Sequence, residues 1–476
     1  MSNGKERVYL CTWGCQMNEH KSEGIAGVLA REGYELVDSP EEADLVIFNT
    51  CMVREKPVDK LYSEAGIIRE LKQQKPDLLL GIGGCVAQAL GERLFARNEA
   101  IDFVFGSSNI AEIPRLIEQA RRVRQSVWKR AQPVMALDKI PDRIEELPFL
   151  RASAFQARVT ITEGCSNFCS FCIVPYTTGL LRSRLPGDIL REVRALADQG
   201  YQEVQLLGQN VDSYGNDLDE PEINFANLLR AMTHIDIPRV RFTSSHPQDI
   251  TPNVIEVLGE KNICEHVHMA VQAGSDRVLK AMRRGYTKEQ FLDLVGRIKA
   301  RVPAVNITTD IIVGFPGEEE RDFLETVDLV KRARFGGAYI FKYSPRPGTI
   351  SYYKYRDGVP PEEKQRRLAR LLELQKQITQ EENVKRVGQM VEVLAEGEAR
   401  GNGKLWGKTR DNKTVVFAGP RAWIGQLINV RVTDADIGGL YGEVDTSTRS
   451  HVRTLKALSV PTCQRVNVLT TSGEGQ

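Results

Sequence analysis

The chain has 476 residues, of which 41% are hydrophobic and 27% are charged, and its formal net charge is +1. This length predicts two to four domains. The composition is typical of a soluble globular protein and contains no run of about 18 apolar residues that a membrane span needs. Because the net charge is close to zero, any surface for nucleic acid must be local.

The chain begins with polar residues that lead directly into a strand-like pattern, so we expect no signal peptide. A cytoplasmic location follows as the expectation, and cysteines stay reduced there. The nine cysteines therefore predict metal binding or chemistry rather than disulfides.

The first part of the chain alternates strand-like and helical patterns, which predicts a Rossmann-like parallel α/β domain. The expected strands are 8–10, 45–48, 78–82 and 101–105, and the expected helices include 22–31 and 111–123. The stretch 123–150 is mixed, basic and rich in proline, and we interpret it as a connector between domains.

Three cysteines, Cys15, Cys51 and Cys85, each follow one of these strands beside Gly or Asn. Ligands of open α/β sheets gather at the carboxyl ends of strands, so the three thiols can meet although they are about 35 residues apart. A single cysteine is most often simply buried. Three in the same context favour a shared cluster, whereas Cys11 and Cys264 lack this context and Cys463 lies in a polar tail.

A second cysteine group, Cys165, Cys169 and Cys172, follows a probable strand at 157–163. Its spacing wraps one loop around a single centre. A closed zinc site or an ordinary four-cysteine cluster requires a fourth ligand. Three ligands leave one coordination position open for a reacting molecule.

Repeated strand and helix units follow this loop and predict a full or partial (β/α) barrel with its chemistry at the carboxyl ends of the strands. The expected later strands are 203–207, 240–243, 266–271, 306–313 and 338–341. Two strand ends are candidates for cofactor contact: Gln209 with Asn210, and the turn Gly314, Phe315, Pro316 and Gly317. We expect His266 and His268 to be ordinary hydrogen-bonded histidines, because no zinc-ligand spacing surrounds them. The charged helix from 361 to about 386 is expected to pack on a domain surface.

The last part of the chain has short, glycine-punctuated strands that predict a small all-β barrel. Cations alternate there with one aromatic residue, which suits RNA phosphates and base stacking. The candidate RNA contacts are Arg400, Lys404, Trp406, Lys408, Arg410 and Lys413. Acidic neighbours nearly balance this charge, so composition alone leaves RNA binding open. Residues after about 447 read as a flexible tail.

The spacing of Cys165, Cys169 and Cys172 resembles the CxxxCxxC signature of radical S-adenosylmethionine enzymes, and the flanking residues resemble their methylthiotransferase branch. This resemblance implies an N-terminal methylthiotransferase domain (6–122), a connector (123–150), a radical core (151–383), an RNA-binding TRAM domain (384–447) and a tail (448–476). The surroundings of Cys15, Cys51 and Cys85 resemble the members that modify N(6)-dimethylallyladenosine in tRNA. One position departs from the family, which commonly has Arg where this chain has Thr178.

The resemblance further implies two 4Fe–4S clusters, one on each cysteine triplet, with S-adenosylmethionine on the open iron of the second triplet and its adenine beside Phe171. A radical derived from this cofactor would remove hydrogen from carbon 2 of the adenosine next to the anticodon, and the cluster on Cys15, Cys51 and Cys85 would supply sulfur that a second S-adenosylmethionine methylates. The implied partners are the anticodon arm of tRNA, an electron donor such as flavodoxin or ferredoxin, and a sulfur source, with the enzyme a monomer.

Two alternatives remain open on the residues. Related methylthiotransferases act on threonylcarbamoyl-adenosine in tRNA or on an aspartate of a ribosomal protein. The second alternative is a non-catalytic RNA-binding protein that holds zinc at the cysteines. Zinc closes its ligand shell, however, so two open triplets favour iron–sulfur chemistry.

Overall fold

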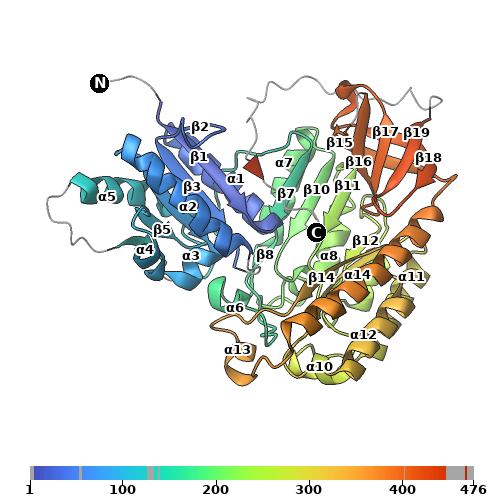
Figure 1. Cartoon of the computed structure of the whole chain (residues 1–476). Helices are drawn as coiled ribbons and strands as arrows, with labels where there is room; N and C mark the ends of the chain where they lie inside the picture. Colours follow the sequence, from blue (N-terminus) through green and yellow to red (C-terminus); the bar gives the residue numbers. More distant parts are fainter. Residues whose placement is uncertain are drawn as a thin grey trace.

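The computed structural model describes residues 5–52, 56–125, 133–137, 140–400, 403–445 and 467–468. A parallel α/β domain, an open barrel and a small β-barrel follow one another along the chain (Figure 1). This arrangement confirms the predicted fold class. Within the described residues, no helix is long and apolar enough to cross a membrane.

The N-terminal sheet is parallel along its whole path. Its strands, in spatial order, are β2 (Glu35–Leu36), β1 (Arg7–Trp13), β3 (Leu45–Thr50), β4 (Leu79–Gly84), β5 (Phe103–Phe105) and β6 (Val134–Ala136), and β20 (Asn467–Val468) pairs with β1. Every residue of β3 and β4 is buried, as expected for a parallel sheet covered on both faces.

Helices cover both faces of this sheet (Figure 1). They are α1 (Gln16–Arg31), α2 (Lys56–Gln74), α3 (Cys85–Leu90), α4 (Arg93–Arg97), the 3₁₀ turn η1 (Ile110–Glu112) and α5 (Ile113–Gln125). The stretch expected as a connector is partly structural, since β6 lies within it and adds a strand beside β5. Three residues are too few to give a recognisable period, so the sequence pattern did not reveal this strand.

The central domain is a six-stranded open barrel. Its strands are β7 (Gln156–Thr160), β10 (Glu203–Leu207), β11 (Arg239–Phe242), β12 (His266–His268), β13 (Asn306–Val313) and β14 (Gly337–Lys342). Parallel ladders join β7, β10 and β11 and then β12, β13 and β14, and isolated bridges connect the two groups. Among the strands that the structure describes, β7 and β14 share no ladder, so the barrel is open between them.

Helices surround the outside of this barrel, and shorter elements connect its ends (Figure 1). The helices are α6 (Val174–Thr177), α7 (Pro186–Asp198), α8 (Phe225–Met232), α9 (Pro252–Val257), α10 (Asp276–Ala281), α11 (Lys288–Arg301), α12 (Glu320–Ala333), α13 (Ile350–Lys354) and α14 (Pro361–Val384); the other short elements are β8 (Thr162–Glu163), β9 (Arg182–Ser183) and η2 (Val211–Ser213). The long α14 packs on the surface of this domain, as expected, and buries Leu371 and Ile378 against the main core.

Alternation along the barrel strands separates an apolar outside from a polar inside. Leu206 and Phe242 belong to the core beneath the helices, whereas their neighbours Gln205 and Arg241 point the other way. The barrel interior is therefore lined with polar side chains, which must find partners or a ligand.

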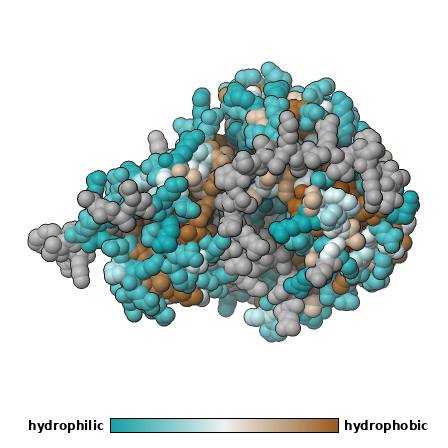
Figure 2. All heavy atoms as spheres, turned by 90° about the horizontal axis from the view of Figure 1, so that it is seen from above, coloured by the Kyte–Doolittle hydropathy of each residue, from teal (hydrophilic) through white to brown (hydrophobic). Residues whose placement is uncertain are grey.

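The C-terminal domain is a closed barrel. Its strands, in spatial order, are β15 (Met390–Glu398), β16 (Lys404–Thr409), β17 (Thr414–Ala418), β19 (Leu440–Val444) and β18 (Leu427–Ala435), with a 3₁₀ turn η3 (Arg421–Trp423). The face of the molecule seen from above is mostly hydrophilic, with hydrophobic residues showing in places (Figure 2). The tail expected at 448–476 lies outside the described residues, apart from β20.

The turn between β16 and β17 closes the amino-terminal end of the open barrel. Arg241 donates to the carbonyl oxygens of Thr409 and Arg410, each at 3.0 Å. The same guanidinium pairs with buried Glu203 at 3.0 Å. Arg239 is fully buried and donates to the Glu392 carboxylate at 2.8 Å. The two domains are thus joined through charges that the barrel interior cannot leave unpaired.

Arg241→Met should lower the free energy of unfolding by about 3–5 kcal/mol, because it leaves the Glu203 carboxylate buried without its main partner. The matched control is Arg230→Met, which removes an exposed pair with Glu256 and should change stability by less than about 1 kcal/mol. Urea unfolding midpoints of the two full-length variants measure the difference. Equal midpoints would contradict a structural role for Arg241.

Candidate functional site

The first cysteine triplet lies at one edge of the N-terminal sheet. The strand register aligns the last residues of β1, β3 and β4, which are Trp13, Thr50 and Gly84. Cys15 then caps α1, Cys51 follows β3 and Cys85 begins α3. The sharp turn at Gly84 has φ of +90°, and a Cβ there would lie 2.4 Å from the Thr50 carbonyl oxygen, so only glycine lets Cys85 reach the other two thiols.

The contacts of these thiols stabilise a thiolate at Cys15. A hydrogen bond from Cys51 and backbone N–H groups at the start of α1 lower the pKa of Cys15 to about 6. Burial is the main cause that raises the pKa of Cys85 to about 11, and the neighbouring Cys15 charge contributes to this rise. Cys15 therefore lies beside both Cys51 and Cys85, and a cluster shared by the three thiols stays a prediction.

The second triplet occupies the loop between β8 and α6. Gly164 opens this loop with φ of +77°, and a Cβ on it would lie 2.0 Å from the Leu180 carbonyl oxygen. The amide of Cys165 donates to the carbonyl of Gly179, and the amide of Cys172 donates to that of Cys169. The loop is thus held by its own backbone, with all three sulfurs on one short turn.

Arg284 is the principal charged partner of this loop. Its Nη1 donates to the Cys169 sulfur at 3.1 Å, and its guanidinium lies 5.5 Å from the Tyr286 ring centre. Burial raises the pKa of Cys172 to about 12. A donor aimed at a sulfur is a common feature of iron–sulfur sites, where such bonds tune the cluster. Sequence reasoning missed Arg284, because its contact with the loop spans 115 residues.

The six thiols of the two triplets are available as metal ligands, because none of them forms a disulfide. In the part of the chain that the structure describes, no three His, Cys, Asp or Glu side chains are placed to hold one metal ion. The donor from Arg284 to the Cys169 sulfur is the contact that suits an iron–sulfur ligand, and it belongs to the second triplet.

The two triplets adjoin across the boundary between the α/β domains. Ile173, directly after Cys172, belongs to the hydrophobic core that contains Val86, directly after Cys85. The Thr178 hydroxyl lies beside the Cys85 sulfur and lowers its pKa, against the dominant effect of burial. The two cysteine loops are therefore packed against each other, although they belong to different domains.

A buried ion cluster, formed by Lys21, Glu163 and Arg182, fixes this junction. Lys21 of α1 pairs with Glu163, and Arg182 donates to the same carboxylate at 3.2 Å. Burial opposes the charge on Glu163, but the two cations keep its pKa below the usual value. Arg182 also donates to the Thr178 carbonyl at 3.2 Å. Thr178 stands at the position where the family commonly has Arg. The guanidinium of Arg182 therefore lies next to this position.

The expected cofactor contacts gather around the second triplet. Phe171 packs against the small hydrophobic cluster that contains Phe315. Gly314 and Gly317 have φ of +72° and +80°, and the Gly314 amide donates to Glu318 at 2.5 Å. Pro316 lies between these glycines in the same turn.

At the neighbouring strand end, Asn210 donates to Asp249 at 2.5 Å, and Asn167 of the cysteine loop donates to the same oxygen at 3.1 Å. The Oε1 atom of Gln209 is buried and has no hydrogen-bond partner among the described residues. Asp249 therefore links the strand end to the cysteine loop.

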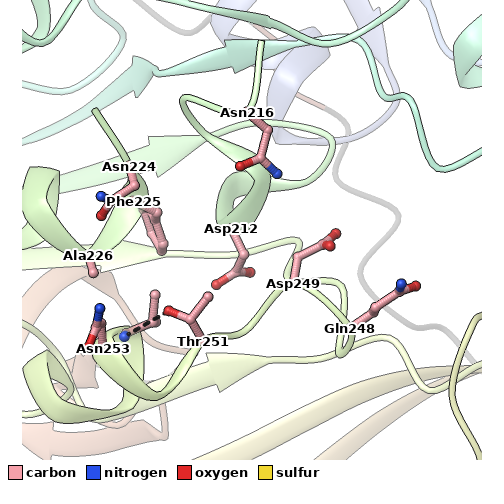
Figure 3. Close-up of a pocket in the computed structure, with 10 residues that line it drawn as sticks. Asp212, Asn216, Asn224, Phe225, Ala226, Gln248, Asp249, Thr251 and Asn253 are labelled. Atoms are coloured by element: carbon pink, nitrogen blue, oxygen red, sulfur yellow. Dashed lines mark hydrogen bonds between the residues drawn. The ribbon is translucent and has the colours of Figure 1, made fainter. Parts of the chain in front are cut away.

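A cavity of about 340 Å³ lies next to Asp249 (Figure 3). Asp212 lines it from the loop after β10 and Asp249 from the loop after β11, and Phe225 forms part of its wall. Burial raises the pKa of Asp212 to about 7. Sequence reasoning missed both carboxylates, although Asp212 follows the Gln209 and Asn210 motif by two residues.

The expected RNA contacts divide into two groups. Arg400 and Lys404 are exposed and Trp406 is half-buried. Arg410 pairs with Glu265 at 2.9 Å, Lys413 is buried and donates to the Gly336 carbonyl, and Lys408 donates to Thr414. The last three cations thus have partners within the protein, and two of them, Arg410 and Lys413, contact the open barrel, whereas the sequence suggested that all three face RNA.

Three family models match successive parts of this chain. The Radical SAM superfamily matches residues 159–330, Uncharacterized protein family UPF0004 matches residues 7–106, and the TRAM domain matches residues 384–444.

Curated relatives named tRNA-2-methylthio-N(6)-dimethylallyladenosine synthase are similar over most of the chain. The protein of Anoxybacillus flavithermus is 45% identical over 94% of this chain and 84% of its own length. That of Carboxydothermus hydrogenoformans is 46% identical over 92% and 99%. Among solved structures, the radical S-adenosylmethionine methyltransferase TsrM from Kitasatospora setae superposes with a TM-score of 0.54 at 16% identity, over 73% of this chain and 74% of that one. This last likeness concerns the fold alone.

In iron-free protein at pH 7, iodoacetamide should label Cys15 first and Cys85 and Cys172 far more slowly, because only the thiolate reacts. Cys15 should reach half of its maximal rate near pH 6, below which it is protonated. The pKa values of about 11 and 12 keep the other two thiols protonated at pH 7. Mass spectrometry of the digested protein measures each rate. Equal labelling of all three, or a midpoint near 9 for Cys15, would contradict the hydrogen bond from Cys51.

Proposed function

This chain belongs to the radical S-adenosylmethionine methylthiotransferases named tRNA-2-methylthio-N(6)-dimethylallyladenosine synthase, and we propose that it adds a methylthio group to carbon 2 of N(6)-dimethylallyladenosine next to the anticodon of tRNA. The adjacency of the two open cysteine triplets carries this proposal. An enzyme that activates a carbon at one centre and delivers sulfur from another needs both centres close to one substrate.

We assign one 4Fe–4S cluster to Cys165, Cys169 and Cys172 and a second to Cys15, Cys51 and Cys85. When bound, the clusters and S-adenosylmethionine supply the radical and sulfur-transfer chemistry that carbon 2 requires, because ordinary acid–base groups do not activate this position. An electron donor such as flavodoxin or ferredoxin and a separate sulfur source complete the system.

Residues of the chain hold and orient the ligands of the two cluster sites and determine the charge around them. Arg284 donates to the Cys169 sulfur and fixes the position of that ligand. The pKa of Cys15 is lower than that of Cys85, so Cys15 loses less of a proton on binding iron, whereas Cys85 must release one. Asp249 holds Asn167 and Asn210 together beside the position that we assign to S-adenosylmethionine. Phe171 and the Gly314 to Gly317 turn complete that side.

We assign RNA binding to the exposed cations of the C-terminal barrel. Arg400 and Lys404 are exposed there, and Trp406 offers a partly accessible ring. Arg410 and Lys413 hold this barrel against the open barrel. The RNA-binding face is therefore rigidly joined to the domain that carries the second triplet.

The test of this function is nucleoside mass spectrometry of tRNA incubated with cluster-loaded protein, S-adenosylmethionine, a reductant and a sulfide source. The expected product is 2-methylthio-N(6)-dimethylallyladenosine. A methylthio group on threonylcarbamoyl-adenosine, or on a ribosomal protein in a parallel reaction, would replace the proposal with one of the related activities.

Cys15→Ala should remove about half of the iron and abolish the methylthio product, while cleavage of S-adenosylmethionine stays measurable. The matched control is Cys11→Ala, which alters a buried thiol in the same strand–loop region and should keep full iron. Iron content, visible absorption and product analysis report the outcome. Unchanged iron in Cys15→Ala would disprove the two-cluster assignment without bearing on the first cluster.

The double variant Arg400→Ala with Lys404→Ala should weaken tRNA binding and reduce the slope of log affinity against log salt by about 1 to 2. Each phosphate contact that is lost removes the release of its counterions on binding. Lys331→Ala removes an exposed cation on α12, outside the barrel, and should have no effect. Fluorescence anisotropy at several salt concentrations measures both. A wild-type slope in the double variant would place the RNA elsewhere.

A further inference from the structure

The first cysteine triplet lies next to the interior of the open barrel. Gln16, next to Cys15, accepts hydrogen bonds from Gln205 of β10 at 3.0 Å and from Thr243 after β11 at 3.4 Å. Thr160 at the end of β7 contacts the Met17 sulfur at 3.8 Å. The start of α1 therefore lies against the inner faces of these three strands, and the Cys15 site borders the barrel interior.

The opposite wall carries an exposed aromatic ring. Tyr339 of β14 is 58% exposed, although its neighbour Ile340 is buried in the main core. Alternation along the strand places Tyr339 on the inner side of the barrel. Its ring contacts that of His268 edge to face, with the centres 6.0 Å apart. A large aromatic ring that the described residues leave open inside a barrel offers a surface for stacking.

A chain of hydrogen bonds fixes the residues beside this ring. Asp310 is the register neighbour of Tyr339. His268 Nε2 lies 3.3 Å from the Asp310 carboxylate, and its Nδ1 lies 2.9 Å from the Thr308 hydroxyl, which also lies 3.0 Å from His266 Nε2.

The Asp310 carboxylate ends this chain of contacts. Burial lowers the pKa of His266 well below its usual value, so this ring is neutral. The Thr308 hydroxyl lies between the two imidazole rings and can donate to one of them while it accepts from the other. A carboxylate accepts several hydrogen bonds, so Asp310 can accept from a ligand in addition to its contact with His268.

From this wall we infer that Tyr339 stacks on the target adenine of the RNA and that Asp310 accepts the hydrogen bond from its N6–H group. The inference rests on the proposed function and identifies the residues that hold the base.

An RNA base is recognised in this way once it has left its stack, by an aromatic face and by polar groups at its edge. N(6)-dimethylallyladenosine keeps one N6–H donor, which matches a carboxylate. The base would then lie within the interior that the Cys15 site borders, so that positioning and sulfur delivery share one space.

Two synthetic anticodon stem-loops test the stacking role. One carries N(6)-dimethylallyladenosine at the target position and the other carries an abasic nucleotide there. Wild-type full-length protein should bind the first at least about tenfold more tightly, in line with the contribution of one base stacked on an aromatic ring. Tyr339→Ala should reduce this preference to less than about twofold, and Tyr339→Phe, which retains the ring, should preserve it.

Affinity for the abasic RNA is the internal control, because it reports the backbone contacts and the folded state alone. A wild-type preference in Tyr339→Ala, or no preference in the wild type, overturns the stacking role. The proposed function fails by a separate result, which is the absence of 2-methylthio product from wild-type protein in the tRNA assay.

A third RNA with N6,N6-disubstituted adenosine has no N6–H and tests Asp310. Wild-type protein should bind it about tenfold more weakly than the dimethylallyl RNA, the loss expected for a hydrogen bond to a charged group. Asp310→Ala should bind these two RNAs with similar affinity. A persisting tenfold difference in this variant overturns the role of the carboxylate.

Discussion

The buried contact of Lys21 and Arg182 with Glu163 is the constraint on which the site depends. Glu163 stands two residues before Cys165, and Lys21 stands six residues after Cys15. A buried carboxylate without partners is strongly destabilising, so the two domains cannot separate here without exposing or neutralising it. The ion cluster therefore sets the distance between the cysteine triplets, and packing of Ile173 against the N-terminal core reinforces it.

The polar interior of the open barrel explains the form of the rest of the molecule. Its amino-terminal end is closed by the C-terminal barrel, which supplies carbonyl oxygens to Arg239 and Arg241. Its side is bordered by the start of α1 through Gln16. Among the described residues, the inner wall that carries His268, Asp310 and Tyr339 stays open. The domains thus act together to close the barrel at its end and along one side, and the Cys15 site borders the interior that they enclose.

The engagement of Arg410 and Lys413 shows how composition can mislead. These cations belong to the stretch of cations and one aromatic residue that suggested RNA contacts, yet they face Glu265 and the Gly336 carbonyl of another domain. Sequence patterns report the face of a strand and not what covers that face. The same reason hid Arg284 and Asp249, whose contacts with the cysteine loop join residues about 80 to 115 positions apart.

The sequence by itself determined the order of domains, the parallel and closed-barrel classes and the three-cysteine spacing of the second triplet, because period and local spacing are properties of neighbouring residues. It also indicated that Cys15, Cys51 and Cys85 meet, since parallel strands end at one edge. Only the tertiary structure decided that the two triplets adjoin, that Thr178 lies beside Cys85 with Arg182 next to it, and that Tyr339 remains exposed inside the barrel. Those facts depend on how separate domains pack and pair their buried charges, which no local pattern encodes.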